Sequence, residues 1–164
     1  MTLSSRNGMS RQQGVALLEV LISVLILGIG LLGIAAMQSM ALRNSQSSYE
    51  HSQAVIQAYS ILDAMRANRA RAIAGDYNQG TPLCTVPAAA GTQVSIDMNS
   101  WMTALKQSMG AVTDTTTCAS VDCQSSGYCI VRVQWDDSRA TNAGPGGATQ
   151  AGQVAEAVEM RTTL

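Results

Sequence analysis

The chain has 164 residues, of which 46% are hydrophobic and only 13% charged, enough for one modest folded domain and hardly enough for two. Its formal net charge is −1 and its Lys and Arg residues form no cluster, which excludes the basic surface of a nucleic-acid-binding protein. Phe is absent and Met occurs nine times, so we expect a small core of aliphatic side chains and Met.

An apolar segment begins close to the N-terminus. From Val15 to Met37, only Glu19 and Ser23 carry side chains that are neither apolar nor Gly. A helix over residues 15–42 would be about 42 Å long at ~1.5 Å per residue, which exceeds the ~30 Å hydrocarbon layer of a bilayer. The leader before Gly14 contains two Arg and no acidic residue, so the positive-inside rule predicts a cytoplasmic leader and an exported C-terminal part.

The residues leave three interpretations of this segment open. A secretory signal would be cut after Ala35, but the apolar run is longer than the roughly 7–15 residues of a signal peptide. An uncleaved anchor explains the length, but it gives no reason for Glu19, whose carboxylate costs free energy within a membrane. Cleavage between Gly14 and Val15 instead creates a cationic amine four residues before Glu19. In a packed array of such helices, the carboxylate would then dock on the amine of a neighbour.

A short basic leader that ends in Gly14 is followed by VALLEVLISVLILGIGLLG. This pattern resembles the cleavage and methylation motif of type IV prepilins, a superfamily of major pilins, minor pilins and type II secretion pseudopilins. Two further stretches, ILDAMRANRARA at 61–72 and VRVQWDD at 131–137, resemble minor pilins of the type IV pilus. The resemblance implies that a membrane-bound prepilin peptidase cuts after Gly14 and methylates the amine of Val15, which stands where the family usually has Phe.

The resemblance also implies a function. We expect a non-enzymatic minor pilin that helps to initiate assembly of the type IV pilus or to form its tip, supporting adhesion and twitching motility. Its expected partners are the prepilin peptidase, other minor pilins, the major pilin, a tip adhesin and the inner membrane, which it would cross once before joining the pilus. The alternatives are a secretion pseudopilin and, from another class, a membrane-anchored periplasmic binding domain.

A polar but helix-compatible stretch follows the apolar segment. Its apolar residues recur at spacings near three and four, at Val55, Tyr59, Leu62, Met65 and Ile73. Gly75 offers a helix stop, so we predict one helix from about Val15 to Ala74. The predicted organisation is a leader (1–14), a transmembrane helix (15–42), its amphipathic continuation (43–75) and a periplasmic globular head (76–164).

Three glycines in the apolar segment, Gly28, Gly30 and Gly33, spell GxGxxG. A dinucleotide-binding loop needs a strand before it and a helix after it, whereas apolar residues flank this motif on both sides. Close helix packing or local softening of the helix explains the glycines better. We hypothesise that this segment partly unwinds when the subunit leaves the membrane for a filament.

The head is predicted to contain one helix and two strands. Asp97 would cap a helix whose apolar stripe ends at Gly110, the stripe being Trp101, Leu105 and Met109. Residues 128–135 alternate as a strand, and residues 153–164 alternate again after a Gly- and Pro-rich loop at 142–152. We therefore predict an α+β, type IV pilin-like fold in which the long helix packs against a small antiparallel sheet.

Four cysteines, Cys84, Cys118, Cys123 and Cys129, lie in the exported part, where an even number predicts two disulfides. Three pairings are possible, and we favour Cys84 with Cys118 and Cys123 with Cys129. The spacings fit a zinc site poorly, so that alternative is minor, and no metal or cofactor is expected.

No catalytic constellation stands out in the sequence. His51 is the only histidine and is expected on a solvated helix surface. Asp136 and Asp137 follow a strand, where a solvated rim is expected rather than a calcium site or an acid–base pair. We expect no enzymatic activity.

Overall fold

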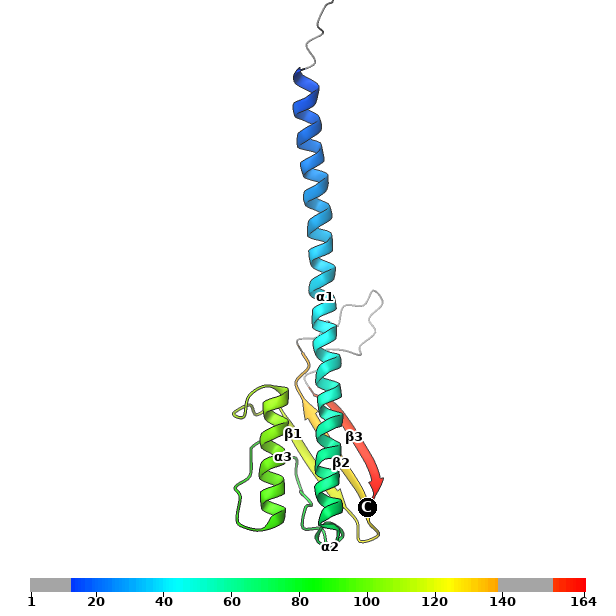
Figure 1. Cartoon of the computed structure of the whole chain (residues 1–164), viewed down its shortest axis with the longest axis vertical. Coiled ribbons are helices and arrows are strands. Elements are labelled where there is room, and N and C mark those ends of the chain that lie inside the picture. The colour runs from blue at the N-terminus through cyan, green and yellow to red at the C-terminus, as the bar shows by residue number, and fades with distance from the viewer. Residues whose placement is uncertain (1–12, 139–154) are drawn as a thin grey trace, which may run out of the picture. The chain divides into compact units, whose positions relative to one another are not determined.

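The computed structural model describes residues 13–138 and 155–164, which contain three helices and three strands (Figure 1). The elements are α1 (Gln13–Ala67), α2 (Arg69–Ile73), α3 (Gln93–Met109), β1 (Cys118–Cys123), β2 (Tyr128–Trp135) and β3 (Glu156–Thr163). The strands form an antiparallel sheet in the order β1-β2-β3. The predicted α+β architecture is therefore confirmed. The chain divides into two compact units between Ser39 and Met40, and we call the second of these the C-terminal unit.

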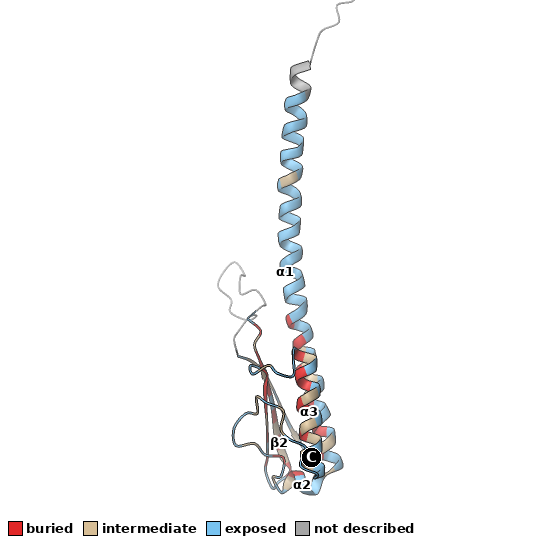
Figure 2. Ribbon diagram, turned by 90° about the vertical axis from the view of Figure 1, so that its left-hand side faces the viewer, coloured by how far each residue is buried: buried red, intermediate tan, exposed pale blue. Residues whose placement is uncertain are grey.

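The core of the C-terminal unit lies between the helices and one face of the sheet. Figures 1 and 2 show the part of α1 beyond Met40 and α3 side by side over that face. Alternate residues of β2 point into this core, because successive side chains of a strand face opposite sides. The largest fully buried apolar side chains are Ile61, Leu62, Met65, Tyr77, Met102, Leu105, Val121, Val131, Val133 and Trp135.

The buried stripe of α1 differs from the predicted one. Ala54 and Ala58 are fully buried, whereas Tyr59 is half exposed. Small side chains at these two positions let the helix lie close to its neighbours, which apolar spacing alone does not reveal. The predicted end of the helix was also too late. α1 ends at Ala67, Asn68 interrupts it, and α2 continues to Ile73 before Gly75 turns the chain at a φ of +84°.

The predicted cap of α3 was wrong. Thr92 caps the helix in a reciprocal arrangement with Ser95, in which each side chain accepts from the other residue's backbone N–H. Asp97 lies inside α3 and accepts a hydrogen bond from the Tyr77 hydroxyl at 2.5 Å. Burial and this hydrogen bond raise the pKa of Tyr77 to about 12. The expected stop at Gly110 is confirmed as the C-cap.

The sheet contains one strand that the sequence did not reveal. β1 pairs with β2, with Cys118 opposite Gln134 and Cys123 opposite Cys129. The predicted strand at 128–135 is confirmed with those bounds. β3 begins at Glu156, later than the predicted residue 153, and the predicted 142–152 loop lies outside the described residues.

Two disulfides hold both ends of β1. Cys118, its first residue, is bonded to Cys84, and Cys123, its last, to Cys129 on β2. These are the two pairs that the sequence analysis favours. Leu83 also forms an antiparallel bridge with Ala119, so the segment before α3 is attached to the strand by a covalent bond and by backbone hydrogen bonds.

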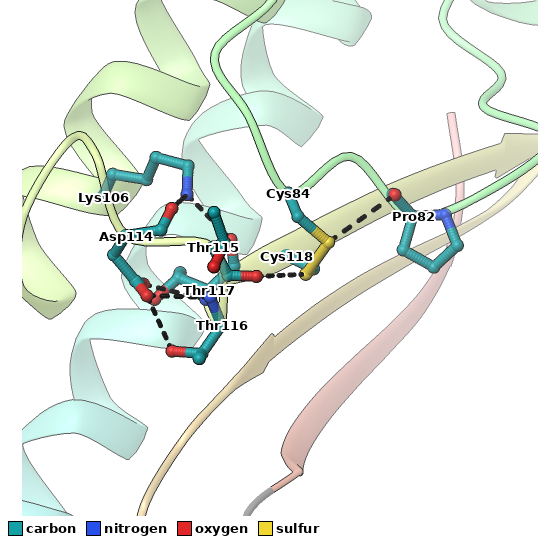
Figure 3. Close-up of a disulfide and its surroundings, with 8 residues drawn as sticks. All are labelled: Pro82, Cys84, Lys106, Asp114, Thr115, Thr116, Thr117 and Cys118. Carbon is teal, nitrogen blue, oxygen red and sulfur yellow. Dashed lines mark hydrogen bonds between the residues drawn. A yellow bond between two sulfur atoms is a disulfide. The ribbon is translucent and has the colours of Figure 1, made fainter.

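Two charged residues, Lys106 and Asp114, hold the loop between α3 and β1 by hydrogen bonds to its backbone (Figure 3). Lys106 is fully buried, and its Nζ donates to the backbone carbonyls of Asp114 and Thr117. The Asp114 carboxylate accepts from the backbone N–H groups of Thr116 and Thr117 at 2.7 and 2.8 Å. Burial opposes ionisation of Asp114, but the hydrogen bonds from Thr117 and Thr116 outweigh it, so the pKa of Asp114 lies well below its usual value. The buried ammonium group of Lys106 thus has hydrogen-bond acceptors, and the loop carbonyls have a donor.

We predict that the two disulfides stabilise the fold unequally. Replacing Cys84 and Cys118 by Ser removes a closed loop of 34 residues, against 6 for Cys123 and Cys129. Chain entropy then gives a loss of about 4 kcal/mol for the first pair and about 2 kcal/mol for the second. Urea unfolding of the detergent-solubilised chain, followed by the fluorescence of the buried Trp101 and Trp135, measures both losses. Equal losses would contradict the entropic account.

We predict that Asp114 makes stability depend on pH under acid conditions. Its folded-state pKa is lowered from 3.8, so its contribution is present above that value and is lost as the pH falls below about 4. Asp114→Asn should be less stable at pH 7 and should lose less stability than the natural chain between about pH 4 and pH 2. Asp122→Asn, at an exposed position of β1, is the control. The melting temperatures of both chains are measured across this pH range. Equal decreases for the natural chain and Asp114→Asn would refute the assignment.

Candidate functional site

The predicted cleavage point lies in the first turn of α1. Gly14 and Val15 follow Gln13, the residue at which the helix begins. The first N–H groups of a helix have no partner within the helix, so releasing Gly14 and Val15 breaks few hydrogen bonds. A peptidase that binds its substrate in an extended form could therefore reach this bond without unfolding the apolar segment behind it.

The side chains that follow are apolar and exposed. Every large apolar residue from Leu17 to Leu42 is exposed, and Figure 2 shows this part of α1 almost entirely pale blue. Among the described residues, one helix is long and apolar enough to cross a membrane, with a mean hydropathy of 2.7 and no part of that window buried. Such a surface is stable only in lipid or against other apolar helices.

Glu19 is the one charged residue between Gln13 and Leu42. It is exposed and lies four residues after Val15, one helical turn along the same face. The hydroxyl of Ser23 donates to the backbone carbonyl of Glu19 at 2.7 Å, which satisfies the other polar side chain of the apolar segment locally. The carboxylate of Glu19 is thus the group in this segment that most requires a partner.

The three glycines of the apolar segment do not interrupt the helix. α1 is continuous through Gly28, Gly30 and Gly33, and a methyl group added at any of them would meet nothing within 4 Å. The expected helical context is therefore present, and a nucleotide-binding loop is not. The proposed unwinding concerns a filament and stays a prediction.

The cysteines form no metal site. All four sulfurs are used in disulfides, which overturns the minor zinc alternative. Within residues 13–138 and 155–164, no group of three or more His, Cys, Asp or Glu side chains is placed to hold a metal ion.

The remaining titratable candidates hold the fold together. His51 is not simply solvated, since its ring packs edge-on against Trp135 and its Nε2 lies 3.6 Å from a carboxylate oxygen of Glu156. Asp137 is not on a solvated rim, because it is 2% exposed and accepts a 2.7 Å hydrogen bond from Ser47. These contacts join α1 to the end of β2 and the start of β3. Sequence spacing could not reveal them, since Ser47 and Asp137 are 90 residues apart.

Comparison with known proteins points to the N-terminal segment. Residues 9–35 match the family model described as the prokaryotic N-terminal methylation motif. The matched residues include Gly14, Val15 and Glu19, and this motif is the cleavage and methylation site of prepilin peptidase. Comparison with curated proteins and with solved structures gave no significant match. The N-terminal segment of the chain is therefore similar to that of type IV prepilins, a family of structural rather than enzymatic proteins.

Proposed function

We propose that this chain is a minor pilin, a structural subunit that helps to initiate the type IV pilus or to form its tip. One observation carries the proposal: the methylation motif heads the apolar, exposed first part of α1, and the only charged residue between Gln13 and Leu42, Glu19, lies one turn after the predicted new N-terminus at Val15. Cleavage would remove the leader and leave a helix built for lateral packing. The protein would act as the substrate of the peptidase and as a building block.

Electrostatics gives Glu19 its role in assembly. Cleavage after Gly14 creates an ammonium group at Val15, and methylation of an amine keeps its positive charge. An isolated carboxylate within a membrane helix costs roughly 2.5–3.5 kcal/mol near the bilayer centre, and less towards the edge. Pairing Glu19 with the amine of a neighbouring subunit satisfies two charges that lipid disfavours singly. Because the pairing depends on a neighbour, it favours assembly over the isolated helix.

Two stretches favour a minor pilin, and PilV in particular. The residues at 61–72 and 131–137 that resemble PilV supply buried positions, including Ile61, Met65, Val131 and Asp137. The likeness thus falls on positions that set the packing of α1 against β2. In this proposal, the subunit crosses the inner membrane once, with residues 1–14 in the cytoplasm and residues 76–164 in the periplasm. It then joins other minor pilins, the major pilin and a tip adhesin.

A secretion pseudopilin is the second candidate, because the methylation motif is common to both systems. Deletion of the gene separates the two. A minor pilin predicts loss of twitching motility and adhesion with secretion intact, and a pseudopilin predicts the reverse. A membrane-anchored binding domain predicts neither defect.

We predict that Gly14→Leu blocks processing, because a side chain at this position would obstruct the peptidase. The protein should accumulate in membranes as the uncleaved form, at least tenfold more than the natural chain. Gly28→Leu, which places the same side chain in open space on α1, is the matched control and should be cleaved normally. Immunoblots that resolve the loss of residues 1–14 make the measurement. Normal cleavage of Gly14→Leu would contradict the assigned site.

We predict that Glu19→Ala is cleaved normally but fails to assemble. Its amount in sheared pili should fall at least tenfold while the processed form persists in the membrane. Glu19→Gln should fail as well, since it keeps the shape and removes the charge, whereas Ser23→Ala should assemble because its hydroxyl contacts only the backbone of its own helix. Quantitative immunoblots of pili and membranes compare the variants. Normal incorporation of Glu19→Ala would remove the docking role.

A further inference from the structure

A polar groove lies between α1 and the C-terminal end of α3. Its volume is about 260 Å³, and it is lined by Gln46, Tyr49 and Glu50 of α1 and by Gln107, Ser108, Met109 and Gly110 at the end of α3. Gln46, Tyr49 and Gln107 are exposed, whereas Glu50 is only 6% exposed. The groove thus has exposed polar and aromatic side chains at its rim and a buried carboxylate in its wall.

The carboxylate of Glu50 has no cation beside it. Its Oε1 accepts a hydrogen bond from Nε2 of Gln46 at 3.2 Å. Glu50 takes part in none of the ion pairs formed within residues 13–138 and 155–164. Among the buried side chains that the structure describes, the only fully enclosed polar atom without a hydrogen bond is Nε1 of Trp135, so Oε2 of Glu50 must open into the groove. Burying a carboxylate costs free energy unless a cation compensates for the lost water.

The end of α3 adds negative charge to the same groove. The N–H of Gly110 donates to the carbonyl of Lys106, but the next three carbonyls, at residues 107–109, accept no hydrogen bond from the described part of the chain. Unpaired carbonyls at a helix C-terminus carry a partial negative charge. The ammonium group of Lys106 does not neutralise it, because it donates to the carbonyls of Asp114 and Thr117 on the other side of α3 (Figure 3). Two independent sources of negative charge therefore favour a cation in the groove.

The groups around the groove indicate which cation fits. Calcium binds tightly where several carboxylates converge, and no group of three or more His, Cys, Asp or Glu occurs in the described residues. A guanidinium group suits the groove better, since its planar fork binds a carboxylate and its remaining N–H groups can donate to carbonyl oxygens. Tyr49, which is 57% exposed at the rim, offers an aromatic ring on which a guanidinium can stack.

We propose that this groove receives an arginine side chain from the surface of a partner protein. The guanidinium binds Glu50, stacks on Tyr49 and donates to the carbonyls at the end of α3. Arginine is enriched among the few residues that carry most of the energy of protein–protein interfaces, so one such contact can anchor a larger surface. The inference goes beyond the pilin assignment, because it gives the chemistry of a partner's side chain and holds for any assembly that the chain joins.

A small arginine probe tests the groove in the full, detergent-solubilised chain. N-acetyl-arginine amide should give saturable NMR shifts at the side-chain amides of Gln46 and Gln107. N-acetyl-citrulline amide, which has the same shape without the charge, should give none, and N-acetyl-lysine amide should bind at least threefold more weakly. Glu50→Gln should lower the affinity for the arginine probe at least tenfold. Asp63→Asn, at an exposed carboxylate of the same helix, is the matched control and should leave the affinity unchanged.

The free chain supplies a readout that separates binding from misfolding. Glu50→Gln removes a buried charge without a cation, so its melting temperature in the absence of the probe should not fall. Tyr49→Phe should bind the probe normally, whereas Tyr49→Ala should bind it more weakly. Equal binding of the arginine and citrulline probes, unchanged affinity in Glu50→Gln, or displacement of the arginine probe by millimolar calcium would each overturn the proposal. Because the solution contains no pilus component, none of these results bears on the pilin assignment.

Photocrosslinking in cells tests whether a partner protein supplies the arginine. A benzophenone side chain placed at Gln107 should crosslink to a peptide of another protein that contains an arginine. Glu50→Gln should reduce this crosslink at least fivefold, and Asp63→Asn should not. A crosslink that does not depend on Glu50, a crosslink to residues 139–154 of the same chain, or no crosslink at all would overturn the proposal.

Discussion

The proposed assembly depends on one electrostatic constraint, a single carboxylate in the apolar, exposed first part of α1. Within the part of the chain that the structure describes, nothing covers the apolar side chains of α1 from Leu17 to Leu42, and Glu19 is the only charged residue among them. Lipid can cover the apolar groups but not satisfy the carboxylate. In the proposed function, a new amine at Val15 on an adjacent helix pairs with this carboxylate, and neighbouring apolar helices replace the lipid. The same segment is thus suited first to a membrane and then to an assembly.

The C-terminal unit has a small core and is stabilised in addition by disulfides and buried polar contacts. Its buried side chains include Ala54, Ala58 and Ala72, which bury little apolar area each. Disulfides at both ends of β1, the buried ammonium of Lys106 and the contact between Ser47 and Asp137 add constraints that such a core lacks. In the proposed topology this unit faces an oxidising compartment, where the disulfides can form.

The sequence reveals the features that depend on local pattern. The apolar run, the alternation of β2 and the stop at Gly110 each follow from neighbouring residues, and the structure contains all three. β1 was not predicted, because CASVDC is too short to show a clear alternation. It is held as a strand by its pairing with β2 and by disulfide bonds at its ends. The cap at Thr92 was missed because Asp97 offered a stronger acidic signal inside the same helix. Contacts between residues far apart in the chain, such as His51 with Glu156, leave no trace in spacing.

The candidate site is likewise divided between local and non-local information. Gly14, Val15 and Glu19 are read from one continuous motif, so the sequence alone locates them. The inner and outer faces of α1 beyond Met40 needed the structure, because only burial distinguishes the exposed Tyr49, Ile56 and Tyr59 from the apolar residues that pack into the core.

The mass of the N-terminal peptide of the natural, purified protein tests the central claim most directly. The account predicts a peptide that begins at Val15 and carries one methyl group on its amine. A peptide that begins at Met1 or at Ala36 would contradict it, because Glu19 would then have no cationic terminus one turn away.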